Sequence, residues 1–570
     1  MCSLLDLAPE VLHHIFTHVH PTDLSPLSMT CRYFNQVIQN DELLWKHHYL
    51  CLFDLPPEDG TTSWKTRTTQ LVTAIKILEA DDESTAALQE VLEATLKLIE
   101  VSVSQSPKNT DFLANHFKKA ANLSAFLCKS SLFPRAAPGK WTAAPTAALR
   151  QLSARLHVLG GMNLEDPWPR IDGHTCIHIA ASHDSSAEDD ADDDDSSDSE
   201  DDNTNANTGT DNNNNENDTN NNNNNNNEDD YNDIDDIDDD DANDDDGTDG
   251  GEYPEVVSPA AASAGGDAST PSTSTSTTFS PQPIRYAHPY ARSQVYDLRR
   301  YTQANKWGPF MDDGSGRIDW EKVQAIMIVI GFNYRMYAER RGASSSSHSG
   351  VLRPWDEAFF GIATNSYVSS PLSGKLRPSL HPDLDAVDPY GVTGTWMRIV
   401  CFLDFNDLYA FNFESGRLDP TQDREPLTTR EAFRLIRLQL HVTAVDAPNP
   451  DLGDGDMPVV HFQGTSRSTF MAWDPNANSR IRGTVRKTAS GAIRWTTFSI
   501  FHGEERWRSE GVQIGGIRSA RGILGNWFDK DYDIHGPAGP TAFWKISDEM
   551  VEEAHHNPPP MVQIFLNGGP

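Results

Sequence analysis

Apolar positions at helical spacing open the chain. A stripe at i, i+3, i+4 and i+7 predicts a first amphipathic helix, and its members are Leu12, Ile15, Phe16 and Val19. Pro9 stands where the first turn of a helix needs no backbone N–H donor, and Pro21 ends the helix. Two further stripes follow within residues 24–31 and 34–38. Three helices in about forty residues bury little surface, so we expect a partner or the rest of the chain to complete their packing.

Longer helical patterns follow. Two are expected between residues 60 and 160, with the apolar stripes Leu88, Val91, Leu92, Leu96 and Ile99, and Leu149, Leu152, Leu156 and Leu159. Another is expected at 319–340, where Asp319 can cap a helix that contains Ile326-Met327-Ile328-Val329-Ile330. A helix this apolar is predicted to be a buried strut that supports the C-terminal part of the chain.

From about residue 388 the pattern changes to short runs rich in aromatic and β-branched residues. Residues 480–486 alternate polar and apolar side chains, as a half-buried strand does. Turn sequences separate the runs, for example at 489–491 and 502–505. The predicted strands are 396–403, 408–413, 435–445, 459–462, 481–486, 493–501, 506–514, 524–528 and 541–546. Many short strands with no helix between them favour an antiparallel barrel or sandwich.

A short internal repeat supports closure of this sheet. Gly391-x-x-Gly394-x-Trp396 recurs as Gly522-x-x-Gly525-x-Trp527. Glycines at a strand start let another strand approach closely, and Trp can fill the open end of a barrel. The two copies lie near the first and last predicted strands, which must meet if a barrel closes.

Residues 184–283 differ from the rest in composition. Runs of Asp lead to eight consecutive Asn at 220–227 and then to a Ser/Thr/Pro/Ala-rich stretch. Such sequence cannot bury enough apolar surface to offset its ordering entropy, so we expect disorder. It is either a solvated linker inserted at a surface loop or an electrostatic attractant for basic partners that phosphorylation could strengthen.

These patterns divide the chain. We expect a three-helix domain at 1–50, a helical linker region at 51–183, a disordered acidic insert at 184–283, a β-barrel-like domain at 284–547 and a tail at 548–570. The fold class is therefore multidomain α + β, with an antiparallel barrel or sandwich in the C-terminal half.

The N-terminal residues resemble an F-box. The resemblance rests on Leu7-x-Pro9-Glu10, Pro21-x-Asp23-Leu24, Thr30-Cys31-Arg32-x-Phe34 and Leu44-Trp45. It implies that this region binds an adaptor of the Skp family, and through it a cullin. The residues that the resemblance predicts to face the adaptor are Leu7, Pro9, Leu12, Ile15, Leu24 and Leu27.

The C-terminal half resembles one family of fungal F-box proteins and, more distantly, the β-barrel substrate-binding domain of some animal F-box-only proteins. The residues that carry this resemblance include Trp307-Gly308-Pro309-Phe310, Arg494-Trp495-Thr496, Glu505 to Gly511, and Gly525-x-Trp527 through Pro540. The resemblance implies a receptor for a protein substrate but does not name that substrate.

Charge and composition exclude several other classes. The formal net charge is −38, but residues 184–252 contain thirty Asp or Glu and no Lys or Arg, so only 54 acidic residues stand against 46 basic ones elsewhere. No basic stripe indicates nucleic-acid binding. Six Cys without C-x-x-C spacing predict neither a disulfide framework nor a metal site. No apolar run reaches the length of a membrane span, and we see no secretory signal. We therefore expect no cofactor, metal, membrane or nucleic-acid partner, and a location in the cytoplasm or nucleus.

The chain also lacks the local motifs of common enzymes. There is no Walker loop, no Gly-x-Ser-x-Gly elbow and no His-Glu-x-x-His helix. We predict a non-catalytic subunit of an SCF-type ubiquitin ligase, which positions a target near the conjugating enzyme. The alternative is a scaffold that binds the Skp adaptor without a cullin and recruits basic proteins through its acidic tract.

Target binding is expected at the barrel ends and loops. Arg and Trp cluster there in sequence, and Arg forks suit carboxylate or phosphate groups. The candidate target-binding residues are Arg506, Trp507, Arg508, Arg518, Arg521 and Trp527. The competing interpretation is that the Arg residues simply occupy the solvent face of strands.

Overall fold

The computed structural model describes residues 4–56, 62–80, 85–100, 108–136, 142–161, 284–340, 358–414, 419, 422–429, 431–469 and 477–552. The chain divides into two compact units, Met1–Ser186 with Phe279–Pro570, and Ala187–Thr278. The second unit and the predicted disorder of residues 184–283 lie outside the described residues. The architecture is mixed α and β, with N-terminal helices and a C-terminal eight-stranded antiparallel barrel.

The N-terminal helices are α1 (Pro9–Phe16), α2 (Leu24–Thr30), α3 (Arg32–Asn40) and α4 (Glu42–Leu52). Pro9 occupies the first turn of α1 as predicted. α4 is a fourth helix beyond the three that the sequence predicted, and Asp41 Oδ1 accepts the Leu44 amide and caps it. The small core of this bundle consists of Leu12, Phe16, Leu24, Ile38, Leu44 and Trp45.

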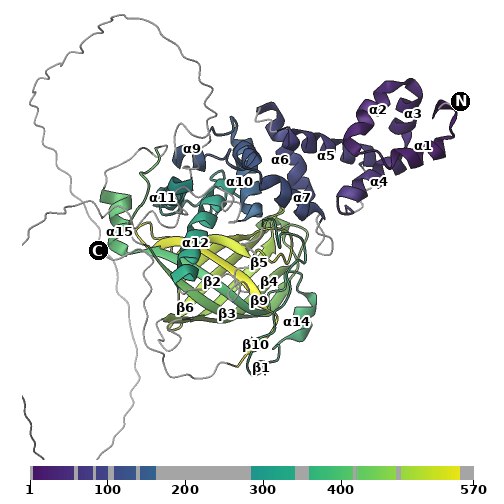
Figure 1. Cartoon of the computed structure of the whole chain (residues 1–570). Helices are drawn as coiled ribbons and strands as arrows, with labels where there is room; N and C mark the ends of the chain where they lie inside the picture. The colour runs from purple at the N-terminus through teal and green to yellow at the C-terminus, as the bar shows by residue number, and fades with distance from the viewer. Residues whose placement is uncertain are drawn as a thin grey trace, which may run out of the picture. The chain divides into compact units, whose positions relative to one another are not determined.

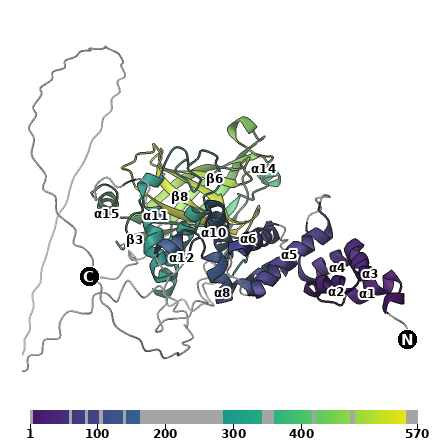
Figure 2. The ribbon, with the colours of Figure 1, turned by 90° about the horizontal axis from the view of Figure 1, so that it is seen from above.

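The next helices come from both sides of the insert. Before it lie α5 (Trp64–Glu79), α6 (Thr85–Glu100), α7 (Lys108–Phe117), α8 (Ala120–Asn122), η3 (Leu123–Leu127), α9 (Leu132–Ala136) and α10 (Ala147–Gly160). After it lie α11 (Ile284–Val295), η6 (Leu298–Arg300) and α12 (Trp320–Arg340). α12 packs against α10, α11 and the strands β8 (Ile523–Asp529) and β9 (Ala538–Ser547), and α11 packs against α9 (Figures 1 and 2). The predicted strut at 319–340 is thus confirmed.

The remaining barrel strands are β2 (Gly394–Leu403), β3 (Glu431–Asp446), β4 (Val459–Ser468), β5 (Asn478–Lys487), β6 (Ile493–Phe501) and β7 (Glu504–Gln513). Each strand pairs antiparallel with the next, and β9 returns to pair with β2, which closes the barrel. Eight of the nine predicted strands are present. Smaller elements are α14 (Pro382–Val387), η8 (Pro450–Leu452) and the pair β1 (Leu376–Arg377) and β10 (Met550–Val551).

The predicted strand at 408–413 is wrong. This segment forms α15 (Phe405–Tyr409) and η7 (Ala410–Glu414), a helical connection between β2 and β3. Asp404 Oδ1 accepts the Asn406 amide and starts the helix. Phe405, Tyr409 and Phe413 then recur every four residues, with ring centroids 6.3 and 5.0 Å apart. The aromatic residues have helical spacing, but Phe and Tyr also have high strand propensity, and the strand prediction followed that propensity.

The barrel has two chemically different faces. Side chains such as Met397, Ile399 and Cys401 point outward and join the core that the helices cover. Their neighbours point inward, where Trp396, Trp495, Phe462 and Phe543 pack together as an aromatic cluster. We call the end where β2 begins the Gly394 end and the end where β2 finishes the Leu403 end.

The glycine–Trp repeat marks strand starts on β2 and β8. Gly391 and Gly522 both have positive φ, +67° and +73°, which favours glycine. A Cβ on Gly394 would lie 2.3 Å from the carbonyl oxygen of Ser547, so this glycine allows β2 and β9 to pair closely. The second copy lies on the penultimate strand and not on the last one, because β9 closes the barrel. Trp527 contacts the first strand nonetheless, since its Nε1 donates to the carbonyl oxygen of Cys401, at 2.9 Å.

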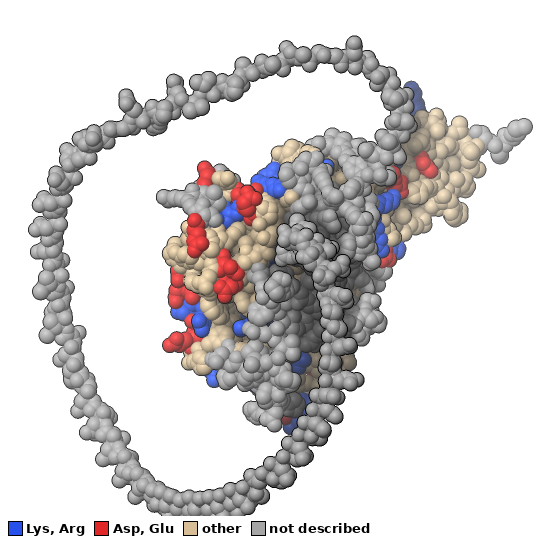
Figure 3. Space-filling view, turned by 60° about the vertical axis from the view of Figure 1, so that its left-hand side comes forward, with Lys and Arg blue, Asp and Glu red and all other residues tan. Residues whose placement is uncertain are grey.

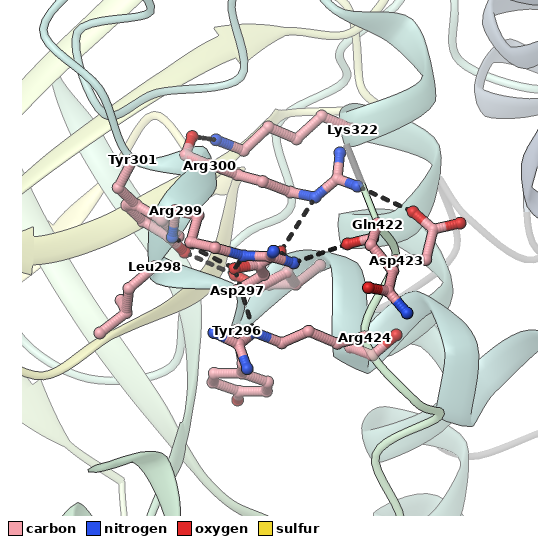
Figure 4. Close-up of polar contacts among 12 residues, drawn as sticks. Tyr296, Asp297, Leu298, Arg299, Arg300, Tyr301, Lys322, Gln422, Asp423 and Arg424 are labelled. Carbon is pink, nitrogen blue, oxygen red and sulfur yellow. Dashed lines mark hydrogen bonds and ion pairs between the residues drawn. The ribbon is translucent and has the colours of Figure 1, made fainter. Parts of the chain in front are cut away.

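A buried carboxylate fastens the β2–β3 connection to the segment after α11. The Asp297 carboxylate contacts Arg299 Nη2 at 2.8 Å, Arg424 Nε at 3.3 Å and Arg300 Nε at 3.6 Å (Figure 4). Burial alone would raise the pKa of Asp297, but these guanidinium groups outweigh it and hold that pKa below its ordinary value. This cluster therefore positions the connection at the Leu403 end.

Candidate functional sites

The N-terminal bundle carries apolar side chains on its surface as well as in its core. The exposed ones are Leu4, Leu5, Val11, Ile15, Met29 and Leu43. Val11 and Ile15 lie four residues apart on α1 and so share one side of that helix, with 46% and 37% exposure. An exposed apolar surface of this density on a small bundle is typical of a protein-binding site.

The six predicted adaptor-binding residues differ in exposure. Pro9 and Ile15 are exposed, and Leu7 and Leu27 are half-buried. Leu12 and Leu24 are fully buried in the bundle core, so in this structure they support the surface and do not form it. Val11, Met29 and Leu43 are exposed here but were not among the six predicted residues. The i, i+4 spacing of Val11 and Ile15 was the available signal.

Residues 4–51 match the family model described as F-box-like. The chain carries an F-box-like domain. F-box domains bind adaptors of the Skp family and typically act as adaptors, not as catalysts. No curated protein and no solved structure matches the chain.

Two other kinds of site, a membrane-spanning helix and a metal centre, were sought among the described residues. None of their helices has the length and apolar character needed to cross a membrane. They also contain no group of three or more His, Cys, Asp or Glu side chains that could hold a metal ion. On the face seen in Figure 3, basic and acidic side chains of the described residues lie among one another.

The candidate Arg and Trp residues do not form one rim. Strand β7 runs from the Leu403 end to the Gly394 end, so residues before and after it lie at opposite ends of the barrel. Arg506, Trp507, Arg508 and Trp527 belong to the Leu403 half, whereas Arg518 and Arg521 follow β7 at the Gly394 end. The single cluster inferred from sequence proximity is therefore wrong as an arrangement, and the role of each residue in target binding stays a prediction.

At the Leu403 end, two of these residues form a pair inside the barrel mouth. The rings of Trp507 and Trp527 meet edge to face with centroids 5.4 Å apart. The exposed Arg506 lies over the Trp507 ring, with its guanidinium carbon 4.9 Å from the centroid. Arg and Trp are the residue types enriched at the energetic centres of protein interfaces.

Arg508 forms an ion pair with Glu510 on the outer face of the barrel. Its Nη2 lies 2.6 Å from Glu510 Oε1, and Arg494 Nε lies 2.8 Å from Glu510 Oε2. Burial alone would raise the pKa of the fully buried Glu510, but the two guanidinium groups hold that pKa below its ordinary value. Arg508 thus neutralises a buried carboxylate of its own chain.

The two Arg residues at the Gly394 end differ in exposure. Arg521 is fully buried, with Nε donating to the carbonyl oxygen of Phe360 at 2.6 Å and Nη2 to that of Gly160 at 3.2 Å. It ties the end of α10 to the barrel. Arg518 is exposed and lines a small cavity with Tyr367 and Lys545.

The barrel interior contains a charge that sequence analysis missed. Arg398 is 3% exposed, and its Nε and Nη2 donate to Thr541 Oγ1 and Ser509 Oγ at 3.1 and 2.6 Å. Burial lowers its pKa to about 10. Among the described residues no carboxylate forms an ion pair with it, and burial alone shifts its pKa. The aromatic cluster therefore fills only the Gly394 half of the interior, and the rest is lined by buried hydroxyl groups, those of Ser466, Ser468, Thr497, Ser499, Ser509 and Thr541.

Proposed function

We propose that this chain is the substrate-recognition subunit of an SCF-type E3 ubiquitin ligase. The observation that carries the proposal is the exposed apolar surface of the F-box-like domain, which gives a Skp-family adaptor a surface to bury. The adaptor links the chain to a cullin, and the barrel domain holds the target. The chain itself contributes positioning, which raises the effective concentration of a target lysine near the conjugating enzyme.

The construction of the barrel supports a role in target binding that is separate from adaptor binding by the F-box-like domain. Its wall is braced by α12 and by helices from both sides of the acidic insert, so its ends are held rigidly relative to those helices. Binding loops on a rigid scaffold are the usual arrangement for recognition. We propose the exposed Arg506 with the Trp507–Trp527 pair as one target-contact group and the exposed Arg518 as another, with Arg508 and Arg521 holding these two ends in place. We also propose that the complex works in the cytoplasm or nucleus.

A second function is a scaffold that uses the adaptor without a cullin. The acidic composition of residues 184–252 favours it, because thirty carboxylates without a single Lys or Arg would attract basic proteins. The two functions differ in one measurable property, the stoichiometric presence of a cullin.

The test is co-purification of the full chain with the Skp adaptor and the cullin. The variants are Val11→Asp and Ile15→Asp, which place charge in the exposed apolar surface. Leu55→Asp is the matched control, since Leu55 is a 57% exposed leucine outside the F-box-like match. We expect the wild type and Leu55→Asp to retain both partners and the two α1 variants to lose both. Adaptor without cullin would favour the scaffold, and no partner at all would reject both functions.

A further inference from the structure

A cleft of about 920 Å³ lies between the helices and the Gly394 end of the barrel. One wall is helical, from the end of α6 and the exposed side of α10. The other wall comes from two barrel turns, β5–β6 and β7–β8, and the segment 311–320 borders both. This volume is near the upper end of the range for ligand sites, about 300–1,000 Å³.

The floor of the cleft is apolar. Its described side chains include Leu152, Leu159, Met311, Ile318, Trp320 and Ile517. Aliphatic and aromatic groups of this kind, grouped in a concave surface, bind apolar anchors of a ligand.

The rim of the cleft is cationic. Arg155, Arg317 and Lys487 line it, and Glu100 is the single carboxylate among the described lining residues. Arg155 lies over the Trp320 ring at 5.3 Å, and its Nη2 contacts Glu100 Oε1 at 3.1 Å, while its Nε is buried without a hydrogen-bond partner. Glu100 is 57% exposed, so an arriving carboxylate can compete with it for this guanidinium at little cost.

The other two cations have partners outside the lining. Arg317 contacts Asp313 and Lys487 contacts Asp456, each at 2.8 Å. The carboxylates are solvent-exposed, and exposed ion pairs contribute only about 0–1 kcal/mol. An arriving carboxylate can therefore replace either partner at little cost.

The barrel wall of the cleft is preformed. Gly515 has φ +86°, and a Cβ there would lie 2.4 Å from the carbonyl oxygen of Ile362. A Cβ on Gly516 would lie 2.2 Å from Thr364 Oγ1, and the Gly516 amide donates to Ile362 at 2.8 Å. The β7–β8 turn is thus pressed against residues 362–364, which fixes its shape. A preformed wall lowers the ordering cost of binding.

From this combination we infer that the cleft binds an acidic peptide segment with apolar anchor residues, and that this segment belongs to the target protein. Apolar side chains enter the floor, and Asp or Glu side chains meet Arg155, Arg317 and Lys487. The inference rests on the proposed function, because a substrate receptor must bind a segment of its target protein. It assigns recognition of this segment to the cleft at the Gly394 end, and the Trp507–Trp527 mouth stays a separate proposed contact.

The test uses the full chain bound to its adaptor and a library of random octapeptides. Selected peptides are expected to combine at least two apolar residues with a net negative charge, and their capture is expected to weaken at high salt. Ala148→Trp, which places a bulky ring on an exposed cleft-lining position of α10, and Arg155→Glu should each reduce capture at least tenfold. Arg480→Glu, at an exposed arginine near the Leu403 end of β5, is the matched control and should leave capture unchanged.

Each other result overturns the inference. Selection of basic or neutral peptides, equal capture by Ala148→Trp, or loss of capture only in Arg480→Glu would each do so. Lys487→Glu provides a milder variant on the rim if Arg155→Glu disturbs folding. Adaptor and cullin binding are measured on the same samples. Loss of those partners with intact peptide capture would reject the ligase role alone, and the reverse result would reject the cleft alone.

Discussion

Arg292 on α11 and Glu431 on β3 form an ion pair that is almost completely removed from water. Arg292 Nε lies 3.2 Å from Glu431 Oε2, and the side chains are 3% and 1% exposed. Arg292 also donates from Nη1 to the carbonyl oxygen of Leu427, and Asn333 on α12 donates to the same carboxylate. The pair therefore joins the first helix after the acidic insert to the barrel wall.

Removal of the cation should be costly. Burial is the main reason that the pKa of Glu431 is raised, and Arg292 opposes that rise. Arg292→Met would leave the carboxylate buried without its charge partner, so we expect the free energy of unfolding to fall by about 3 kcal/mol. Urea denaturation measures the change. Arg317→Met removes an exposed ion pair and should cost less than about 1 kcal/mol; equal losses in the two variants would contradict the account.

Stability should also depend on pH through Glu510. Arg494 and Arg508 hold the pKa of this buried carboxyl below its ordinary value against the effect of burial. The unfolded chain then binds this proton more tightly than the folded chain does. The stabilisation is therefore present above the unfolded pKa of about 4.3 and is lost as the pH falls toward the folded value.

Glu510→Gln should consequently lower the free energy of unfolding at pH 7 and flatten its decline below about pH 4.3. Urea denaturation between pH 7 and pH 3 gives both quantities. Glu504→Gln, an exposed change at the start of the same strand, is the control. A decline in Glu510→Gln as steep as that of the wild type would show that other groups govern the acid limb.

Arg398 should behave in the opposite way to Arg292. It is buried in the barrel with hydroxyl partners and without an ion pair to a described carboxylate. Arg398→Met keeps most of the volume and removes the desolvated charge, so we expect the free energy of unfolding to stay constant or to rise by about 1 kcal/mol. Thermal and urea unfolding test this. A loss above about 2 kcal/mol would mean that the Thr541 and Ser509 hydrogen bonds outweigh the desolvation cost.

In the F-box-like domain, neighbouring residues should separate folding from binding. The side chain of Leu12 is fully buried, whereas the side chain of Val11 is 46% exposed. Leu12→Ala should cost about 2–5 kcal/mol of unfolding free energy, because it leaves a cavity in the small core. Val11→Ala should change stability by less than about 0.5 kcal/mol but weaken adaptor binding. Circular dichroism melts and adaptor titration check the two effects.

The sequence predicted elements better than it predicted sites. Local periodicity and ordered anchor residues were enough to predict eight strands, the α12 strut and the F-box-like domain, because both signals lie in short stretches of sequence. The segment 408–413 was misread because Phe and Tyr favour strands wherever packing does not decide. The resemblance placed Leu12 among the adaptor-facing residues, and the helical stripe could not show that the domain itself covers this side chain.

Long-range arrangement explains the remaining misses. Arg508 and Arg521 are close in sequence, yet Arg508 lies midway along β7 and Arg521 follows that strand at the Gly394 end. Each contacts a partner that the sequence does not mark. Arg398 looked like any other polar strand position until the closed barrel put it inside. The cleft is likewise invisible in the sequence, since its walls come from six separate segments.

The most direct test of the ligase-receptor account is isothermal titration of the purified Skp adaptor into the full chain, with wild type, Ile15→Asp and Leu55→Asp compared. The account predicts one-to-one binding by the wild type and Leu55→Asp, and affinity at least tenfold weaker for Ile15→Asp. No heat of binding with the wild type, or equal affinity for all three proteins, would show that the exposed surface of the F-box-like domain is not an adaptor site and would contradict the central claim.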